Sequence, residues 1–176
     1  MRSAIESFEA GFNRLTHFFA ALVAISIGLF AVLIPLNLLL IKTGVGNFAW
    51  LYESVEYTLF SGVFLGAPWV LQQGAHVKVD IVTQSLPATV AVRLERLMDG
   101  FGAVLCLVLC SYGVRSAWQE FVEDTLPDKD LRIDTWIMMS VFAFAFLMLA
   151  VEFLLRMRRA KVIVAKEETA ASEAGL

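Results

Sequence analysis

The chain alternates long apolar runs with short polar segments. The first run, residues 18–41, contains 24 consecutive residues without a formal charge. As an α-helix it would extend about 36 Å, which exceeds the hydrocarbon thickness of a bilayer, about 30 Å. Three further apolar runs lie at about 57–74, 98–120 and 135–155. The pattern predicts an all-α membrane protein with four transmembrane helices.

The two ends of the chain predict smaller features. Residues 1–17 place Ile5, Phe8, Phe12 and Leu15 on roughly one face of a helix. This amphipathic lead-in is typical of a segment that lies at the level of the lipid headgroups. Residues 158–176 are small and polar, so we expect a polar cytoplasmic tail there.

The connection between the second and third runs is helical in part. Leu86-Pro87 predicts the start of a helix that continues to about Val122, because proline suits the first turn of a helix. Such a helix would be about 50 Å long, too long for the bilayer alone. Its charged first part therefore either projects from the membrane or forms a separate helix. We expect an interfacial helical segment between spans two and three.

Composition supports a membrane protein and excludes other classes. Apolar residues make up 59% of the chain and the mean hydropathy is +0.72, against about 45–50% apolar residues in soluble domains. The net charge of −3 leaves no basic surface for nucleic acid. Cys106 and Cys110 have no nearby histidine to complete a zinc site, so we interpret them as buried thiols.

The basic residues predict the orientation of the spans. With a cytoplasmic N-terminus, ten of the 14 Lys and Arg residues lie on the inner side and four on the outer side. Cytoplasmic loops carry the excess of positive charge in membrane proteins, so both termini are predicted to be cytoplasmic. The outer segments are acidic and include Glu53, Glu56, Glu120, Glu123, Asp124, Asp128 and Asp130. These carboxylates either solvate the membrane edge or form a docking rim for an extracytoplasmic partner.

Three groups of residues are candidates for contact with a partner. Gly62 and Gly66 are four residues apart in the second run, and such a spacing lets another helix approach closely. The charged positions Arg93, Arg96 and Asp99 alternate with apolar ones before the third span, which favours an interfacial or partner-facing surface. The acidic outer loop supplies the third group: Glu123, Asp124 and Asp128.

The most distinctive segment follows the second span. It begins near Gly66 and continues through Gly74-Ala75-His76, Val79-Asp80 and Leu86-Pro87. His76, Lys78 and Asp80 alternate with apolar residues, which favours a segment anchored at the cytoplasmic interface over a catalytic site. No nucleophile or metal-ligand set accompanies them in the sequence.

This segment resembles the small membrane subunit of the tripartite ATP-independent periplasmic (TRAP) transporters, the DctQ-like family. The matching positions are Gly74, Ala75, His76, Val79, Asp80 and the helix opener Leu86-Pro87, placed after the second of four spans. One departure is that the family often has a basic residue shortly before the glycine, where this chain has glutamines.

The resemblance implies a role in uptake across a bacterial inner membrane. In such systems a periplasmic binding protein delivers an organic acid to a permease that a sodium gradient drives. The large permease subunit holds the substrate and sodium, and the small subunit is a scaffold that offers part of the docking surface. The resemblance thus implies a protein that is not an enzyme and has no cofactor of its own.

Two alternatives remain at the level of the sequence. His17 and His76 are both predicted near the cytoplasmic face, so a haem-binding anchor of a redox complex is conceivable. A free-standing channel or membrane enzyme would need polar groups at mid-depth, whereas the centres of the four spans are almost purely apolar. We expect Asp99, Arg115 and Glu152 to lie near span ends, where they reach water or headgroups.

Overall fold

Four long helices make up the regular structure of the described residues. The computed structural model describes residues 2–48, 50–73, 88–123 and 133–173. Within them lie α1 (Arg2–Thr43), α2 (Trp50–Gln72), α4 (Ala88–Glu123) and α5 (Thr135–Glu173). The described part of the chain contains no strand. The prediction of an all-helical chain with four long helices is confirmed.

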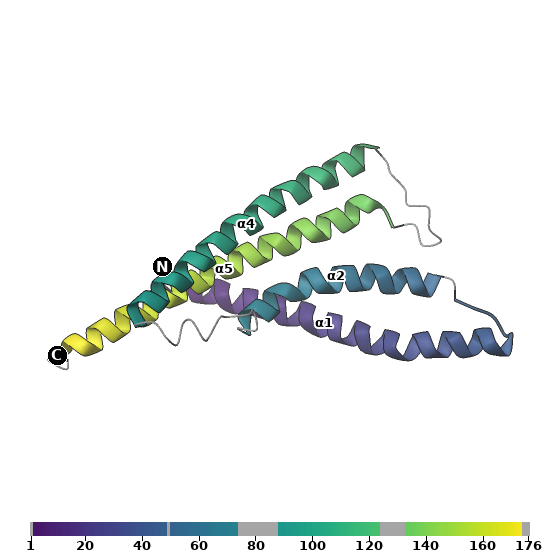
Figure 1. The fold of residues 1–176 in the computed structure, drawn as a ribbon, viewed down its shortest axis with the longest axis horizontal. Coiled ribbons are helices and arrows are strands. Elements are labelled where there is room, and N and C mark those ends of the chain that lie inside the picture. Colours follow the sequence, from purple (N-terminus) through teal and green to yellow (C-terminus); the bar gives the residue numbers. More distant parts are fainter. Residues whose placement is uncertain (1, 49, 74–87, 124–132, 174–176) are drawn as a thin grey trace.

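The helices form two antiparallel hairpins that meet at one end of the molecule. α1 pairs with α2, and α4 pairs with α5. The hairpins converge where α1 begins and α5 ends, and they diverge toward the opposite end (Figure 1). The start of α1, the end of α2, the start of α4 and the end of α5 therefore lie at the same end, as an up-and-down order of helices requires.

Three of the helices are long and apolar enough to cross a membrane, over Ile5–Thr43, Arg93–Glu123 and Thr135–Arg159. α2 does not meet the same criteria of length and composition. It is 23 residues long, or about 35 Å, but it carries Glu53, Glu56 and several other polar residues. Its length is sufficient for a span.

Two predicted segments next to the membrane are continuous with long helices in the structure. The lead-in 1–17 does not form a separate interfacial element, because α1 continues through it without a break. Phe12 packs against Met148 and Leu155 of α5, so this segment joins the bundle. The helix predicted to continue from Leu86-Pro87 to about Val122 is seen from Ala88 to Glu123 as one helix, so its charged first part is not a separate helix. The rest of that prediction, residues 75–87, falls outside the described residues.

A turn that contains two glycines, Gly44 and Gly46, follows the end of α1. Gly44 donates its N–H to the carbonyl of Ile41 at 3.2 Å, and Val45 donates to Leu40 at 3.2 Å. This pair of bonds is the Schellman arrangement, in which the residue after the helix adopts a left-handed conformation. Gly44 has φ of +73°, which glycine adopts without steric cost.

Glycines and aromatic rings set the packing between the helices. A Cβ at Gly113 would lie 2.8 Å from Phe142 Cδ1 and 3.2 Å from Ala143 Cα, and a Cβ at Gly102 would lie 2.8 Å from Phe153 Cζ. α4 and α5 therefore approach closely only because these positions lack a side chain.

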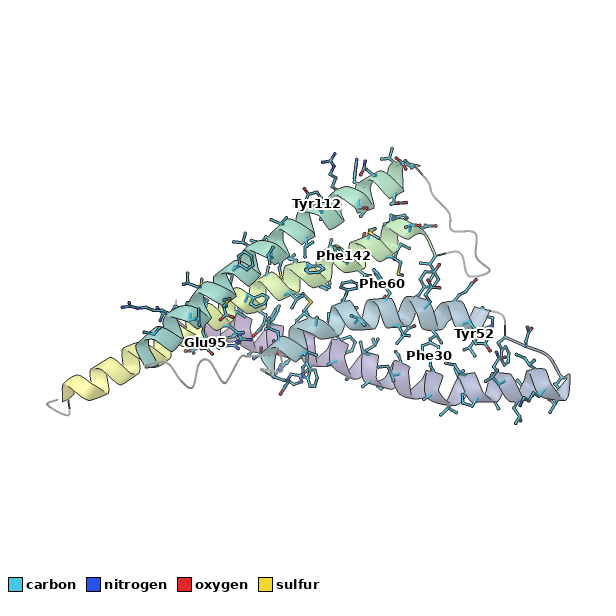
Figure 2. All side chains as sticks on the ribbon, in the orientation of Figure 1. Phe30, Tyr52, Phe60, Glu95, Tyr112 and Phe142 are labelled. Atoms are coloured by element: carbon cyan, nitrogen blue, oxygen red, sulfur yellow. The ribbon has the colours of Figure 1, made fainter. Side chains whose placement is uncertain are left out.

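Aromatic side chains fill the space where α2 meets α5. Phe64 contacts Phe142 and Phe146 with ring centroids 5.0 and 5.9 Å apart. Figure 2 shows side chains of both helices, among them the labelled Phe60 and Phe142, between the two hairpins. This aromatic cluster forms the apolar part of the contact between the two hairpins. Polar residues form the rest of that contact.

Candidate functional site

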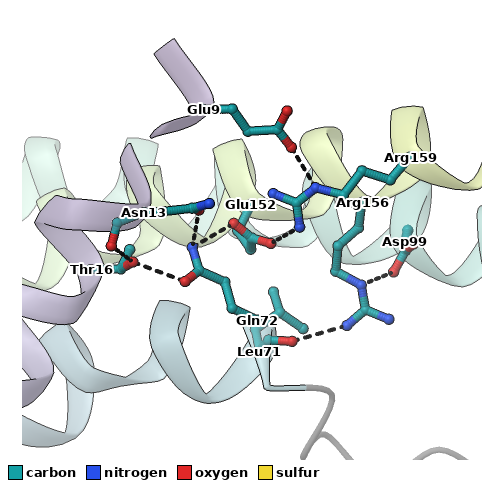
Figure 3. A network of polar contacts seen from close by, with 9 residues as sticks. All are labelled: Glu9, Asn13, Thr16, Leu71, Gln72, Asp99, Glu152, Arg156 and Arg159. Atoms are coloured by element: carbon teal, nitrogen blue, oxygen red, sulfur yellow. Dashed lines mark hydrogen bonds and ion pairs between the residues drawn. The ribbon is translucent and has the colours of Figure 1, made fainter. Parts of the chain in front are cut away.

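The polar residues buried at the junction of the hairpins form one network. Glu152 and Thr16 are fully buried, and Asp99 is 7% exposed. They lie at the end where the four helices converge, and residues of all four helices take part (Figure 3). Since a buried charge is costly unless it is paired, the contacts of these residues determine what the site can do.

Gln72, the last residue of α2, is the centre of the network. Its side-chain oxygen accepts a hydrogen bond from Thr16 Oγ1 at 2.9 Å, and its Nε2 donates to Glu152 Oε2 at 2.9 Å and to Asn13 Oδ1 at 3.2 Å. One amide side chain thus connects α1, α2 and α5. Thr16 also donates to the carbonyl of Asn13 within its own helix.

Arg159 supplies the positive charge for the carboxylates beside Gln72. Its Nη1 lies 3.2 Å from Glu152 Oε1, and its Nε forms an ion pair with Glu9 of α1. Glu152 therefore receives hydrogen bonds on both oxygens, one from an amide and one from a guanidinium. This carboxylate faces into the bundle from α5 and ties α5 to α2 through Gln72, while Arg159 ties α5 to α1 through Glu9.

Arg156 extends the network to α4. Its Nε lies 3.6 Å from Asp99 Oδ1, and its Nη1 donates to the backbone carbonyl of Leu71 at 3.3 Å. The last carbonyls of a helix have no partner within the helix, so this contact satisfies one of them at the end of α2. Arg156 joins the α4/α5 hairpin to the α1/α2 hairpin.

We call this network the clasp, because it fastens the four helices together at one end. It consists of the side chains of Glu9, Asn13, Thr16, Gln72, Asp99, Glu152, Arg156 and Arg159 and the backbone carbonyl of Leu71. Its carboxylates are paired with arginines, and its amide and hydroxyl groups bond one another across helices. Such an arrangement fixes the relative position of helices. The expectation that Asp99 and Glu152 reach water or headgroups is wrong, because both side chains face neighbouring helices and are paired there.

The structure separates the predicted partner contacts. Gly62 is buried, and a Cβ there would lie 3.1 Å from Val23 Cγ1 of α1, so the helix that approaches it is a neighbour within this chain. Gly66 is half-buried, with nothing within 4 Å of a Cβ. Asp99 faces α5, away from the surface that the prediction required, because it pairs with Arg156.

The other candidates lie at the surface or outside the described residues. Arg93 and Glu123 are exposed, and Arg96 is half-buried. The buried Nε of Arg96 has no hydrogen-bond partner among the described residues. The motif positions Gly74, His76, Val79 and Asp80 fall outside the described residues, as do Asp124 and Asp128.

Sequence reasoning missed the residues at the centre of the clasp. Glu152, Arg156 and Arg159 are spaced by four and three residues, which places them on one face of a helix. An acidic residue inside an apolar run with arginines at these spacings indicates an inward-facing polar set. Gln72 gave no comparable signal, because a glutamine at the end of a span is expected to be solvated.

Two open grooves lie between paired helices. The groove between α1 and α2 has a volume of about 700 Å³, and its walls carry small and apolar side chains beside His17 and Trp69. The groove between α4 and α5 has a volume of about 500 Å³ and lies among Trp118, Phe121 and Trp136. Both are apolar surfaces on the sides of the hairpins.

The geometry gives no support to the haem alternative. His17 Nδ1 accepts a hydrogen bond from Trp69 Nε1 at 3.2 Å, so one ring nitrogen is already engaged. His76, the second proposed ligand, lies outside the described residues.

Comparison with known proteins identifies the chain at the level of its family. No individual curated protein matches it. The family of tripartite ATP-independent periplasmic transporters, DctQ component, matches over residues 42–161, which include α2, α4 and the membrane part of α5. The match covers more than half of the chain and confirms the resemblance seen in the sequence. The chain therefore belongs to the DctQ family, the small membrane component of the TRAP transporters.

Proposed function

We propose that this protein is the scaffold and docking subunit of a sodium-driven TRAP transporter that imports an organic acid. A large permease subunit carries the substrate and sodium, and a periplasmic binding protein delivers the substrate. The observation that supports this division of labour most strongly is the clasp. The buried carboxylates of the clasp, Asp99 and Glu152, are paired with arginines of the same chain, whereas a transport path exposes polar groups to a solute at mid-depth.

A fourth membrane span over α2 belongs to this proposal. α2 runs antiparallel to α1 and packs against both α1 and α5. Since those neighbours are long and apolar enough to cross the membrane, a helix held between them is placed at the same depth. Both termini are then cytoplasmic in the inner membrane. In a chain whose two natural cysteines are replaced, Val45→Cys should react with a membrane-impermeant thiol reagent added outside the cell. Labelling that occurs only after lysis would contradict this orientation.

The permease contact is proposed at the charged start of α4. Arg93 is exposed, and Arg96 has a buried Nε without a partner among the described residues. Exposed guanidinium groups such as that of Arg93 can pair with carboxylates of another chain at the rim of an interface. Membrane lipid covers the remaining apolar surface, and neither nucleic acid nor a cofactor takes part.

The binding protein is proposed to dock at the opposite end. Glu123 is exposed at the end of α4, and Asp124 and Asp128 follow it in the sequence. Charges at the rim of an interface act mainly on association rate and salt dependence.

Charge reversal tests this docking surface. In vesicles that hold the complete transporter, replacing Glu123, Asp124 and Asp128 with lysine should slow association of the binding protein by about tenfold and alter its salt dependence. The matched control is Arg158→Glu, an exposed charge near the other end of the bundle. Binding-protein kinetics unchanged by the triple reversal would exclude this loop as the docking rim.

A further inference from the structure

The groove between α1 and α2 is an open, apolar groove on one side of the bundle. Small residues of both helices keep it open, among them Ala20 and Ala24 of α1 and Gly66 and Ala67 of α2. A Cβ at Gly66 would meet nothing within 4 Å, so the space beside this position is empty of protein atoms. Val63 and Ile27 flank the groove and are more than half exposed.

The dimensions of the groove match one leaflet of a bilayer. Its wall on α1 extends from His17 to Ile27, which is about 15 Å along the helix and about half of the hydrocarbon thickness. The groove is an apolar space of about 700 Å³ along this length, long enough for an acyl chain that reaches the bilayer centre.

The end of the groove nearest the clasp is polar. Trp69 Nε1 donates to His17 Nδ1 at 3.2 Å across the groove end, so the other ring nitrogen of the neutral histidine carries the proton and is a donor. Arg14 is exposed and lies one turn before His17 on the same side of α1. These residues immediately precede the uncharged run 18–41, where α1 leaves the headgroup region.

We propose that this groove binds a glycerophospholipid, with one acyl chain between α1 and α2 and the phosphate beside Arg14 and His17. The length of the groove fits a chain that reaches from the headgroups to the bilayer centre. Arg14 supplies the positive charge that a phosphate requires, and tryptophan at this depth favours the boundary between headgroups and hydrocarbon. The proposal rests on the membrane placement that the proposed function assumes, and it concerns this chain without its partners.

A groove-filling substitution tests the site. The full-length chain is extracted from membranes that contain phosphatidylethanolamine and phosphatidylglycerol, washed extensively in detergent, and analysed by native mass spectrometry. We expect about one phospholipid per chain on the wild-type protein. Gly66→Leu should reduce the retained phospholipid at least fivefold. Gly28→Leu, which also has nothing within 4 Å of its Cβ but lies outside the groove, should leave it unchanged.

The headgroup contact is tested separately. Arg14→Gln should lower the retained phospholipid about threefold, and circular dichroism should show the same helical content in all variants. Equal retention by wild type and Gly66→Leu, or none by wild type, would overturn the proposal. Loss of the phospholipid on addition of the permease subunit would assign the groove to that subunit instead. Co-purification of the permease with Gly66→Leu separates failure of the lipid site from failure of the scaffold role.

Discussion

At the scale of single residues, Gln72 shows how a neutral side chain can organise charged neighbours. Its amide accepts from Thr16 and donates to Asn13 and Glu152, so it serves α1 and α5 at once. Arg159 already pairs with Glu152, so no second positive charge is needed there. An amide suits this position because it can accept from the hydroxyl of Thr16 and donate to the oxygens of Asn13 and Glu152.

The importance of Gln72 can be measured against its neighbour in the sequence. Gln72→Ala removes three interhelical hydrogen bonds, each worth about 0.6 kcal/mol on average in membrane proteins, so we expect a loss of about 2 kcal/mol in the free energy of unfolding. Gln73→Ala is the control, because Gln73 is exposed and only its backbone bond is seen. Unfolding in mixed micelles gives both values, and equal stability of the two variants would contradict the central role of Gln72.

At the scale of helices, the close pairing of α4 and α5 depends on two glycines on one face of α4. Gly102 and Gly113 are separated by about three turns, and each lies directly against a phenylalanine of α5. Gly62 has the corresponding role between α2 and α1. Small residues such as Gly62, which the sequence offers as candidates for contact with a partner, thus serve contacts between helices of this chain.

This packing predicts opposite outcomes for two glycine substitutions. Gly113→Ala places a methyl group 3.2 Å from backbone Cα of Ala143, which cannot move as a side chain can, so we expect a loss of about 1–3 kcal/mol. Gly28→Ala on α1 meets nothing within 4 Å and should keep or slightly raise stability, because alanine favours helix more than glycine does. Thermal unfolding in detergent compares them, and a neutral Gly113→Ala would show that the helices can separate without cost.

The elements were largely predictable from the sequence, whereas their polar contacts were only partly so. Apolar runs about as long as the bilayer is thick predicted the four helices, because only a helix satisfies its own backbone in lipid. The sequence could not show that α1 continues through its lead-in, because polar residues such as Asn13 and Glu9 read as solvated until Gln72 and Arg159 face them. Asp99 was assigned to the surface for the same reason.

At the scale of the whole molecule, the chain is a pair of hairpins clasped at one end and open at the other (Figure 1). The clasp lies at the end that we place in the cytoplasm, and the divergent ends lie where we place the binding protein. Under the proposed function, a bundle whose helices are fixed by the clasp serves as a rigid support for the permease subunit beside it. Its own grooves are apolar, which suits lipid and helix contacts and does not suit passage of an acid.

The most direct test of this account is solute flux through the chain alone. The purified protein is reconstituted into vesicles under an inward sodium gradient, and uptake of a labelled dicarboxylate, a keto acid and sialic acid is measured. We predict no uptake above empty vesicles, and sodium-dependent uptake once the permease subunit and its binding protein are added. Uptake by this chain on its own would contradict the scaffold role.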